Sequence, residues 1–207
     1  MIGFYNYTVL LTYMSLASTV VGITFCVEGN VHGALICLML SGFFDMFDGT
    51  VARTRKRTED EIAFGMHIDS LTDLAAFGVL PATILGALGG REFWFVIVMV
   101  LYSLAALIRL AFFDVQELRT VGSGERRKYF TGLPVTNAAF ILPALLLVDL
   151  LLGIETRYYY MVSLILVGIA FVTPFKLKKA YMPALIYIGI IGLAVFVCVC
   201  IFGGMIK

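Results

Sequence analysis

The stretch from Phe93 to Phe113 reads FWFVIVMVLYSLAALIRLAFF, in which Arg109 is the only charged residue. A helix needs about 20 predominantly apolar residues to cross the hydrocarbon core of a bilayer. This stretch is therefore predicted to be a transmembrane helix. Because lipid offers no hydrogen-bond partner to an open sheet edge, the other apolar stretches of the chain should also cross as helices.

The composition of the whole chain agrees with that prediction. Of its 207 residues, 61% are hydrophobic and 14% are charged, the formal net charge is +1 and the mean hydropathy is +0.98. An ordinary soluble domain is about half apolar and about a quarter charged, and a globule of this size could not bury the excess. Composition therefore excludes a soluble enzyme, a disordered chain and a nucleic-acid-binding protein with a basic face.

Hydropathy along the chain predicts seven spans. They lie at residues 9–27, 32–48, 69–90, 93–113, 133–152, 158–175 and 181–203. We expect an all-α fold, a polytopic helical membrane protein with about seven transmembrane helices (six to eight). The chain shows no strong internal repeat and no low-complexity segment, so residues 1–207 are interpreted as a single membrane-embedded domain.

The basic residues predict the orientation of the chain in the membrane. With alternating spans, eleven of them fall on one side: Arg53, Arg55, Lys56, Arg57, Arg119, Arg126, Arg127, Lys128, Lys176, Lys178 and Lys179. Only Arg91, Arg157 and Lys207 fall on the other side. Loops rich in Lys and Arg stay in the cytoplasm. We therefore expect an integral protein of the cell membrane, with its N-terminus inside and its C-terminus outside.

Four aspartates gather at the facing ends of two predicted helices on the basic side. Asp45 and Asp48 are three residues apart, and Asp69 and Asp73 are four apart, so each pair shares one helix face. Four carboxylates on adjacent helices would repel one another strongly, and two divalent cations would cancel their formal charge. Hard oxygen ligands suit Mg²⁺ or Mn²⁺, and two such ions are a known clamp for displacement at phosphorus.

Three small residues extend the two acidic faces and leave room for a ligand, namely Gly49, Ala52 and Gly65. Three other interpretations remain open at this point. The acids could be interfacial residues that pair with the neighbouring arginines. They could belong to a cation transporter, although such proteins usually hold acids near the bilayer midplane. A membrane prenyltransferase also uses aspartate-rich motifs and magnesium, but in two well-separated loops.

The pattern Asp45-x2-Asp48-Gly49-x2-Ala52-Arg53-x11-Gly65-x3-Asp69-x3-Asp73 resembles the signature of the CDP-alcohol phosphotransferases. The resemblance implies a membrane enzyme that moves a substituted phosphate from a CDP-alcohol to a second alcohol and releases CMP. It implies one metal on Asp45, Asp48 and Asp69, a second on Asp45, Asp69 and Asp73, and Asp73 as general base. It also implies a nucleotide site formed by Asp48, Gly49, Ala52, Arg53 and Gly65, to which we add Thr12 of the first span.

Three further stretches resemble the phosphatidylserine synthase branch of that family: Asp69–Ala82, Ile108–Val115 and Tyr129–Ala139. The chain departs from that branch at Val135, Thr136 and Asp114, where the branch usually has Ser, Pro and Asn. The resemblance implies CDP-diacylglycerol and L-serine as substrates, membrane lipids around the helices and a homodimer. Arg109 is then a candidate ligand of the acceptor carboxylate. Glycerol phosphate or inositol phosphate as acceptor, and an archaeal-type lipid donor, are the alternatives.

Overall fold

Each predicted span lies on a helix of the structure. The structure is a computed structural model and describes residues 3–4, 6–52, 54–123, 129–152, 155–174, 176–178 and 182–205. Its helices in chain order are η1 (Tyr7–Val9), α1 (Leu10–Val27), α2 (Val31–Ala52), α3 (Glu59–Asp73), η2 (Leu74–Val79), α4 (Leu80–Ala87), α5 (Phe93–Ser123), η3 (Val135–Asn137), α6 (Ala138–Leu152), α7 (Thr156–Val172), α8 (Met182–Phe202) and η4 (Gly203–Met205). The expected all-α fold is confirmed.

The protein is an integral membrane protein. In the part of the chain that the structure describes, four helical segments are long and apolar enough to cross a bilayer, and they cover Tyr7–Val27, Val31–Ala52, Glu59–Ala87 and Phe93–Gln116. Within the described residues, Val135–Asp149, Thr156–Val172 and Gly189–Phe202 are shorter apolar helices. The second of the four segments has 22 residues, which corresponds to about 33 Å of helix, the thickness of a hydrocarbon core.

Two helices extend beyond the predicted spans. The third span was expected to begin at residue 69, but α3 begins at Glu59. Thr58 caps it, because its hydroxyl accepts from the Glu61 N–H at 3.2 Å while the Glu61 carboxylate accepts from the Thr58 N–H at 3.0 Å. Similarly, α5 runs to Ser123, ten residues past the predicted end. Hydropathy finds only the apolar part of a helix, so it missed these polar extensions.

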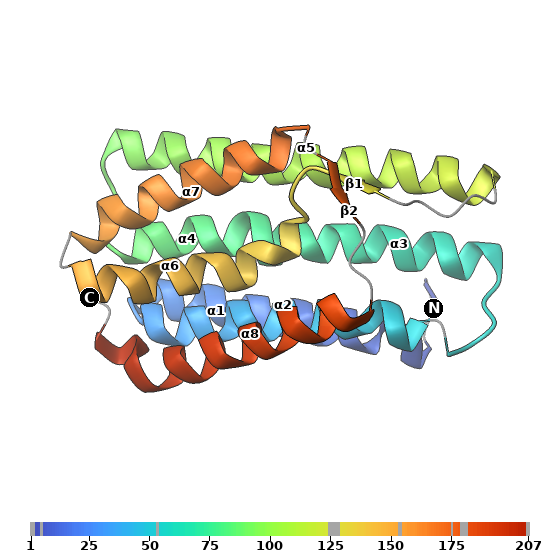
Figure 1. Cartoon of the computed structure of the whole chain (residues 1–207), viewed down its shortest axis with the longest axis horizontal. Coiled ribbons are helices and arrows are strands. Elements are labelled where there is room, and N and C mark those ends of the chain that lie inside the picture. The colour runs from blue at the N-terminus through green and yellow to red at the C-terminus, as the bar shows by residue number, and fades with distance from the viewer. Residues whose placement is uncertain are drawn as a thin grey trace.

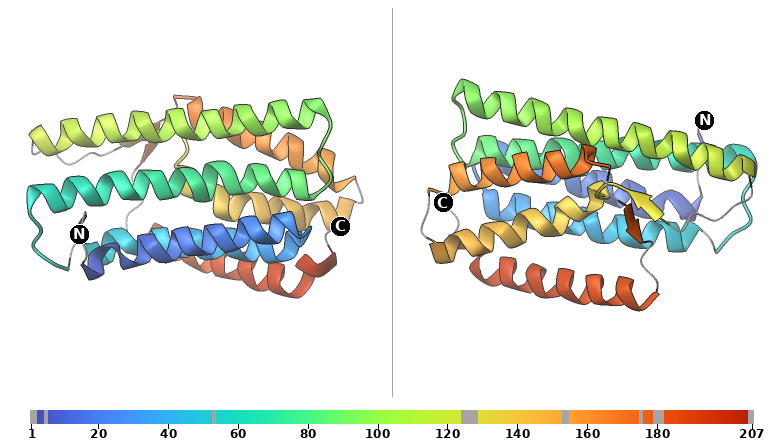
Figure 2. Two further views of the ribbon diagram at one scale, coloured as in Figure 1. Left: turned by 180° about the vertical axis from the view of Figure 1, so that it is seen from behind. Right: turned by 45° about the horizontal axis from the view of Figure 1, so that its top comes forward.

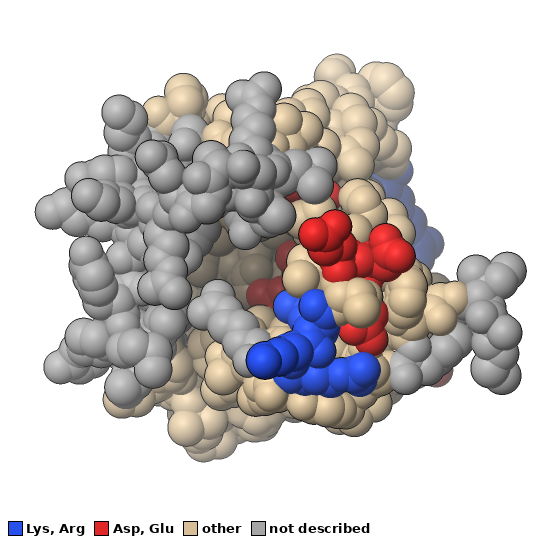
Figure 3. Space-filling view, turned by 90° about the vertical axis from the view of Figure 1, so that its right-hand side faces the viewer, with Lys and Arg blue, Asp and Glu red and all other residues tan. Residues whose placement is uncertain are grey.

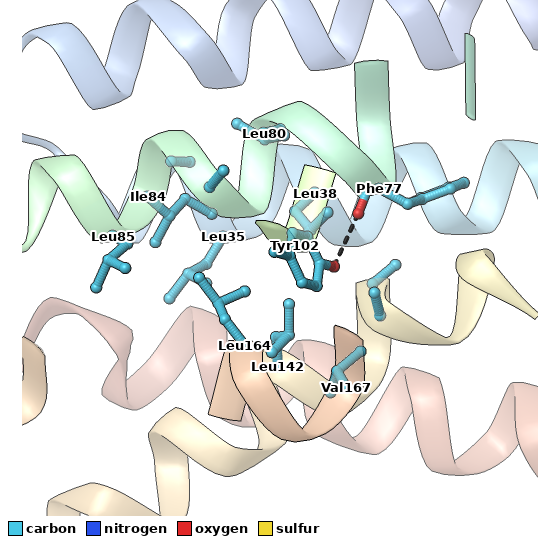
Figure 4. Packing of buried hydrophobic residues seen from close by; sticks show 14 of the residues in the cluster. Leu35, Leu38, Phe77, Leu80, Ile84, Leu85, Tyr102, Leu142, Leu164 and Val167 are labelled. Atoms are coloured by element: carbon cyan, nitrogen blue, oxygen red, sulfur yellow. Dashed lines mark hydrogen bonds between the residues drawn. The ribbon is translucent and has the colours of Figure 1, made fainter. Parts of the chain in front are cut away.

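The helices run side by side along one axis (Figures 1 and 2). The continuous rod of α3, η2 and α4 lies at the centre, with α5 and α7 on one side of it and α1, α2 and α8 on the other. The rod is the most buried of the four long segments. Side chains of the rod and of α2, α5, α6 and α7 pack together in one apolar core, which includes Leu35, Leu38, Phe77, Leu80, Ile84, Leu85, Tyr102, Leu142, Leu164 and Val167 (Figure 4).

Small and polar residues bring α2 close to its neighbours. Ser41 of α2 donates to the backbone carbonyl of Ser15 on α1 at 3.0 Å, and its hydroxyl lies 3.1 Å from that of Thr19. Gly42 allows α6 to approach, because a Cβ at this position would lie 2.5 Å from the Cβ of Ala139. Such small residues are typical of helix contacts in membranes. They fix α2 one turn before Asp45.

A π-helical turn, η2, follows Asp73 directly. Pro81 has no N–H, so the carbonyl of Phe77 four residues earlier would have no partner in an α-helix. The hydroxyl of Tyr102 on α5 donates to that carbonyl at 2.8 Å (Figure 4). The central rod is therefore bonded to α5 about one turn after Asp73.

A short strand pair joins two loops at one end of the bundle. Strand β1 (Tyr129–Thr131) pairs antiparallel with β2 (Lys176–Lys178), which links the α5–α6 connection to the α7–α8 connection. Hydropathy alone gave no sign of it. The strand pair and the α2–α3 loop lie toward the same end of the bundle, and the two termini lie at opposite ends (Figure 1). This arrangement agrees with alternating spans; which end faces the cytoplasm stays a prediction.

Candidate active site

The four aspartates of α2 and α3 come together at one end of the bundle. Asp45, Asp48 and Asp69 each offer a carboxylate oxygen, and these oxygens lie within 4.8 Å of one another. The Asp45 side chain also contacts that of Asp73, and Asp48 contacts Asp69. Figure 3 shows acidic atoms deep in a hollow at this end, beside a group of Lys and Arg side chains. The spacings in the sequence thus correspond to one cluster in space.

A pocket of about 240 Å³ opens beside the cluster. It is lined by Asp45, Asp69, Asp73, Arg109, Leu110, Phe113, Pro134, Val135 and Thr136. Asp73 is its most enclosed carboxylate, with 8% of the residue exposed. The pocket therefore places three carboxylates from α2 and α3 opposite a guanidinium from α5 and the Gly-Leu-Pro segment.

Two threonines contact the acidic cluster. The hydroxyl of Thr12 on α1 donates to Oδ2 of Asp48 at 3.4 Å, so the structure places this predicted residue at the site. The side chain of Thr136, which lies in the η3 turn directly before α6, contacts Asp45. Sequence reasoning missed Thr136 as a site residue, although it had noted the position as a departure from the phosphatidylserine synthase branch. That departure was the available indication, because Thr136 supplies a hydroxyl where that branch usually has Pro.

The two glycines of the motif have few neighbours among the described residues. Within that part of the chain, a Cβ at Gly49 would meet no atom within 4 Å, and one at Gly65 would meet only Nη1 of Arg57, at 3.3 Å. Close packing therefore does not require a glycine at either position, and neither residue has a positive φ that would favour glycine. Ala52 is the last residue of α2 and is half-buried. Arg53, which was predicted to contact the nucleotide, lies outside the described residues.

Arg109 faces the interior of the bundle and is only 5% exposed. Its Nε donates to the backbone carbonyl of Leu133 at 3.1 Å, and its guanidinium carbon lies 5.7 Å from the centre of the Phe113 ring. Gly132, directly before Leu133, has a φ of +78°, and a Cβ there would lie 3.1 Å from the backbone carbonyl oxygen of Phe171, so glycine lets the chain turn at this point. The Gly-Leu-Pro segment therefore orients this arginine toward the pocket.

A hydrogen bond between helices supports Asp69 from the side. The hydroxyl of Ser70 on α3 donates to Oδ1 of Asp114 on α5 at 2.7 Å. Ser70 follows Asp69 directly, so this bond fixes the α3 backbone at a predicted metal ligand. The sequence showed both residues within the branch-like stretches but gave no indication that they meet.

The donor set suits a divalent cation. All the candidate ligands are carboxylate oxygens, which are the hard ligands that Mg²⁺ and Mn²⁺ prefer. Three of them converge from two helices in the described structure, and carboxylates in a membrane helix are costly unless they are paired or bound to a metal. The residues present therefore fit the predicted metals.

The fold and site together define an integral membrane protein with a metal-competent aspartate cluster beside a small pocket. A family model described as CDP-alcohol phosphatidyltransferase matches residues 5–175, and the chain belongs to this family. The chain is similar to the CDP-diacylglycerol–serine O-phosphatidyltransferase of Saccharomyces cerevisiae, with 36% identity over 141 residues, or 65% of this chain and 50% of the relative. It is also similar to the archaetidylserine synthase of Methanothermobacter thermautotrophicus, with 35% identity over 63% of this chain and 53% of the relative.

A third relative matches over a longer range. The CDP-diacylglycerol–serine O-phosphatidyltransferase of Methanocaldococcus jannaschii is 29% identical over 182 residues, which cover 84% of this chain and 80% of the relative. By contrast, the chain spans about half the length of the yeast and Methanothermobacter relatives. The matched range contains every candidate site residue named above, since the family model runs from residue 5 to residue 175.

Proposed function

We propose that this protein transfers the phosphatidyl group of CDP-diacylglycerol to L-serine and releases phosphatidylserine and CMP. The observation that carries the proposal is the single pocket that Asp45, Asp69 and Asp73 share with Arg109. Such a pocket combines ligands for metals and a diphosphate with a cation for a carboxylate acceptor. Membership of the family and the activities for which its relatives are named support the same reaction class.

The pocket favours a small acceptor that carries a carboxylate. Its volume of about 240 Å³ is below the roughly 300–1,000 Å³ of ordinary ligand pockets. Arg109 is buried in its wall, and a planar guanidinium matches a carboxylate through two parallel hydrogen bonds. Thr136 adds a hydroxyl near Asp45. Glycerol phosphate and inositol phosphate are larger than L-serine. Because a guanidinium also binds phosphate, the small volume of the pocket is what favours L-serine over them.

The reaction requires one proton transfer and one displacement at phosphorus. Asp73 accepts the proton of the serine hydroxyl as the serine oxygen forms a bond to the phosphorus that carries the diacylglycerol. The bond from this phosphorus to the bridging oxygen breaks, and CMP leaves with the electron pair. Asp73 suits the role of base because it lies deepest among the pocket carboxylates and the Tyr102 bond holds the following turn.

Two divalent cations, Mg²⁺ or Mn²⁺, complete the proposed site. Asp45, Asp48 and Asp69 would hold one ion, and Asp45, Asp69 and Asp73 the other. When bound, the ions would neutralise the diphosphate and the charge that develops on it. Gly49, Ala52 and Gly65 would leave room for the nucleotide next to them, and the open space among the described residues at Gly49 supports this.

The lipid part of the donor stays in the bilayer in this proposal. An apolar groove of about 240 Å³ lies on the other side of Arg109, between α5 and the end of α7. The similarity to an archaetidylserine synthase makes an archaeal-type lipid donor the second candidate. We further propose that the site faces the cytoplasm at the cell membrane, as the basic α2–α3 loop suggests, and that the protein forms a homodimer.

The test measures CMP release by the purified protein in detergent with Mn²⁺ or Mg²⁺. CDP-diacylglycerol and its archaeal ether-lipid counterpart are each supplied with serine, glycerol 3-phosphate or inositol phosphate. Metal-dependent release with serine alone, lost in the Asp73→Asn variant, is the expected result. Release only with a different acceptor would refute the serine assignment, and comparison of the two donors identifies the lipid.

A further inference from the structure

One basic side chain in the α2–α3 loop lies close to the site, and the preference of basic loops for the cytoplasmic side does not explain this placement. Arg57 lies in the loop between α2 and α3 and is half-buried, whereas its neighbour Lys56 is exposed. Its Nη1 lies 3.3 Å from the position that a Cβ on Gly65 would occupy. Gly65 precedes Asp69 by one helical turn on the same face. The Arg57 guanidinium therefore lies about one turn from the carboxylate cluster.

The acidic residues nearby do not account for this placement. The Glu61 carboxylate accepts from the Thr58 N–H, from Nδ2 of Asn6 at 3.2 Å and from Nη2 of Arg55 at 3.3 Å. Arg55 thus forms an ion pair in this loop, with 42% of its side chain exposed. Within the described part of the chain, no carboxylate lies within 4.0 Å of Arg57. Arg57 acts on the Glu61 carboxylate only as a more distant charge, and its Nη1 lies beside Gly65.

We propose that Arg57 binds a phosphate group of the cytidine nucleotide, an inference that rests on the proposed function. No atom of the described residues lies within 4 Å of a Cβ at Gly49, so a ligand held at the aspartates can extend along this face toward the guanidinium beside Gly65. A guanidinium matches phosphate oxygens through paired hydrogen bonds, which a lysine cannot reproduce. Arg57 lies outside the aspartate signature and is thus a further nucleotide ligand, separate from the acceptor side where Arg109 lies.

The location also explains why Gly65 has no side chain. The Arg57 Nη1 is the only atom of the described residues within 4 Å of a Cβ at this position. A side chain there would displace the guanidinium from the face that leads to Asp69. Gly65 would then serve the nucleotide in two ways, by leaving space for it and by admitting the cation that binds it.

The experiment measures the affinity of the full-length protein in detergent for CDP in the presence of Mn²⁺, by calorimetry. Arg57→Gln should weaken CDP binding by about 10- to 100-fold, the range expected for loss of a charge-assisted hydrogen bond. Arg57→Lys should recover only part of that loss. Lys56→Gln is the matched control, because it removes one positive charge from the adjacent exposed position and should change affinity less than about 2-fold.

A steady-state measurement separates this role from a general effect on folding or charge. Arg57→Gln should raise the KM for the liponucleotide by a similar factor and leave the KM for serine unchanged, with an unaltered melting temperature. Wild-type affinity in Arg57→Gln, or equal losses in Arg57→Gln and Lys56→Gln, would overturn the inference. Absence of CDP binding by the wild-type protein would instead contradict the proposed function itself.

Discussion

The hydrogen bond from Tyr102 to the carbonyl of Phe77 should be essential for the stability of the central helix. Tyr102→Phe removes the hydroxyl and leaves a buried acceptor that Pro81 cannot satisfy, because proline has no N–H. Tyr102 is only 2% exposed, so water cannot easily replace the lost donor. A buried acceptor without a partner costs about 1–3 kcal/mol. We therefore expect Tyr102→Phe to lower the free energy of unfolding, measured in mixed detergent–SDS micelles, by this amount.

The role of the bond between Tyr102 and Phe77 can be tested more sharply in a Pro81→Ala background. Pro81→Ala restores an N–H that can reach the Phe77 carbonyl once the turn relaxes to an α-helix. In that background Tyr102→Phe should cost less than about 0.5 kcal/mol, since the acceptor has another donor. An equal cost in both backgrounds, or a negligible cost in the wild-type protein, would refute the explanation. CMP release should fall with Tyr102→Phe, because η2 begins directly after Asp73.

Three further predictions concern the site and the contact between α2 and α6. Asp73→Asn should lower CMP release by about 10²- to 10⁴-fold while the protein still binds Mn²⁺ through its other aspartates; normal turnover would exclude Asp73 as base. Arg109→Lys should raise the KM for serine far more than the KM for the liponucleotide, and equal effects on both would refute its acceptor role. Gly42→Ala should lower the free energy of unfolding by about 1–3 kcal/mol, because the new Cβ would overlap that of Ala139. Gly49→Ala should leave the free energy of unfolding unchanged yet abolish CDP binding. Unfolding measurements and calorimetry with CDP distinguish the two variants.

The sequence predicted the helical part of the fold well because the membrane imposes a simple rule. Long apolar stretches must be helices there, and all seven predicted spans coincide with helices. The extensions at Glu59 and Ser123 were missed because polar helix outside an apolar span has no hydropathy signal. The capping box at Thr58 was nevertheless readable, since Thr and Glu three residues apart mark a helix start.

The site was predictable only where its residues are close in sequence. The aspartate pairs and the glycines have fixed spacings on two consecutive helices, so helical geometry alone groups them. Thr136 and the bond between Ser70 and Asp114 join segments far apart in the chain. Their residue types are ordinary, and no periodicity links them. The π turn before Pro81 was equally hidden, because Tyr102, which bonds to its Phe77 carbonyl, belongs to the next long helix.

The acidic cluster should make stability depend on divalent cations, and this dependence can be measured without any substrate. Asp45, Asp48 and Asp69 direct three carboxylates at one point, where without a cation they repel one another. A cation that binds only the folded state stabilises it by about 2.7 kcal/mol at a concentration 100 times its Kd. Unfolding in EDTA should therefore occur at a lower temperature than in Mn²⁺, and Asp45→Asn should abolish most of that difference. Because Ca²⁺ and Mg²⁺ differ in size, their shifts should differ as well, whereas a shift that depended only on ionic strength would indicate screening rather than a site.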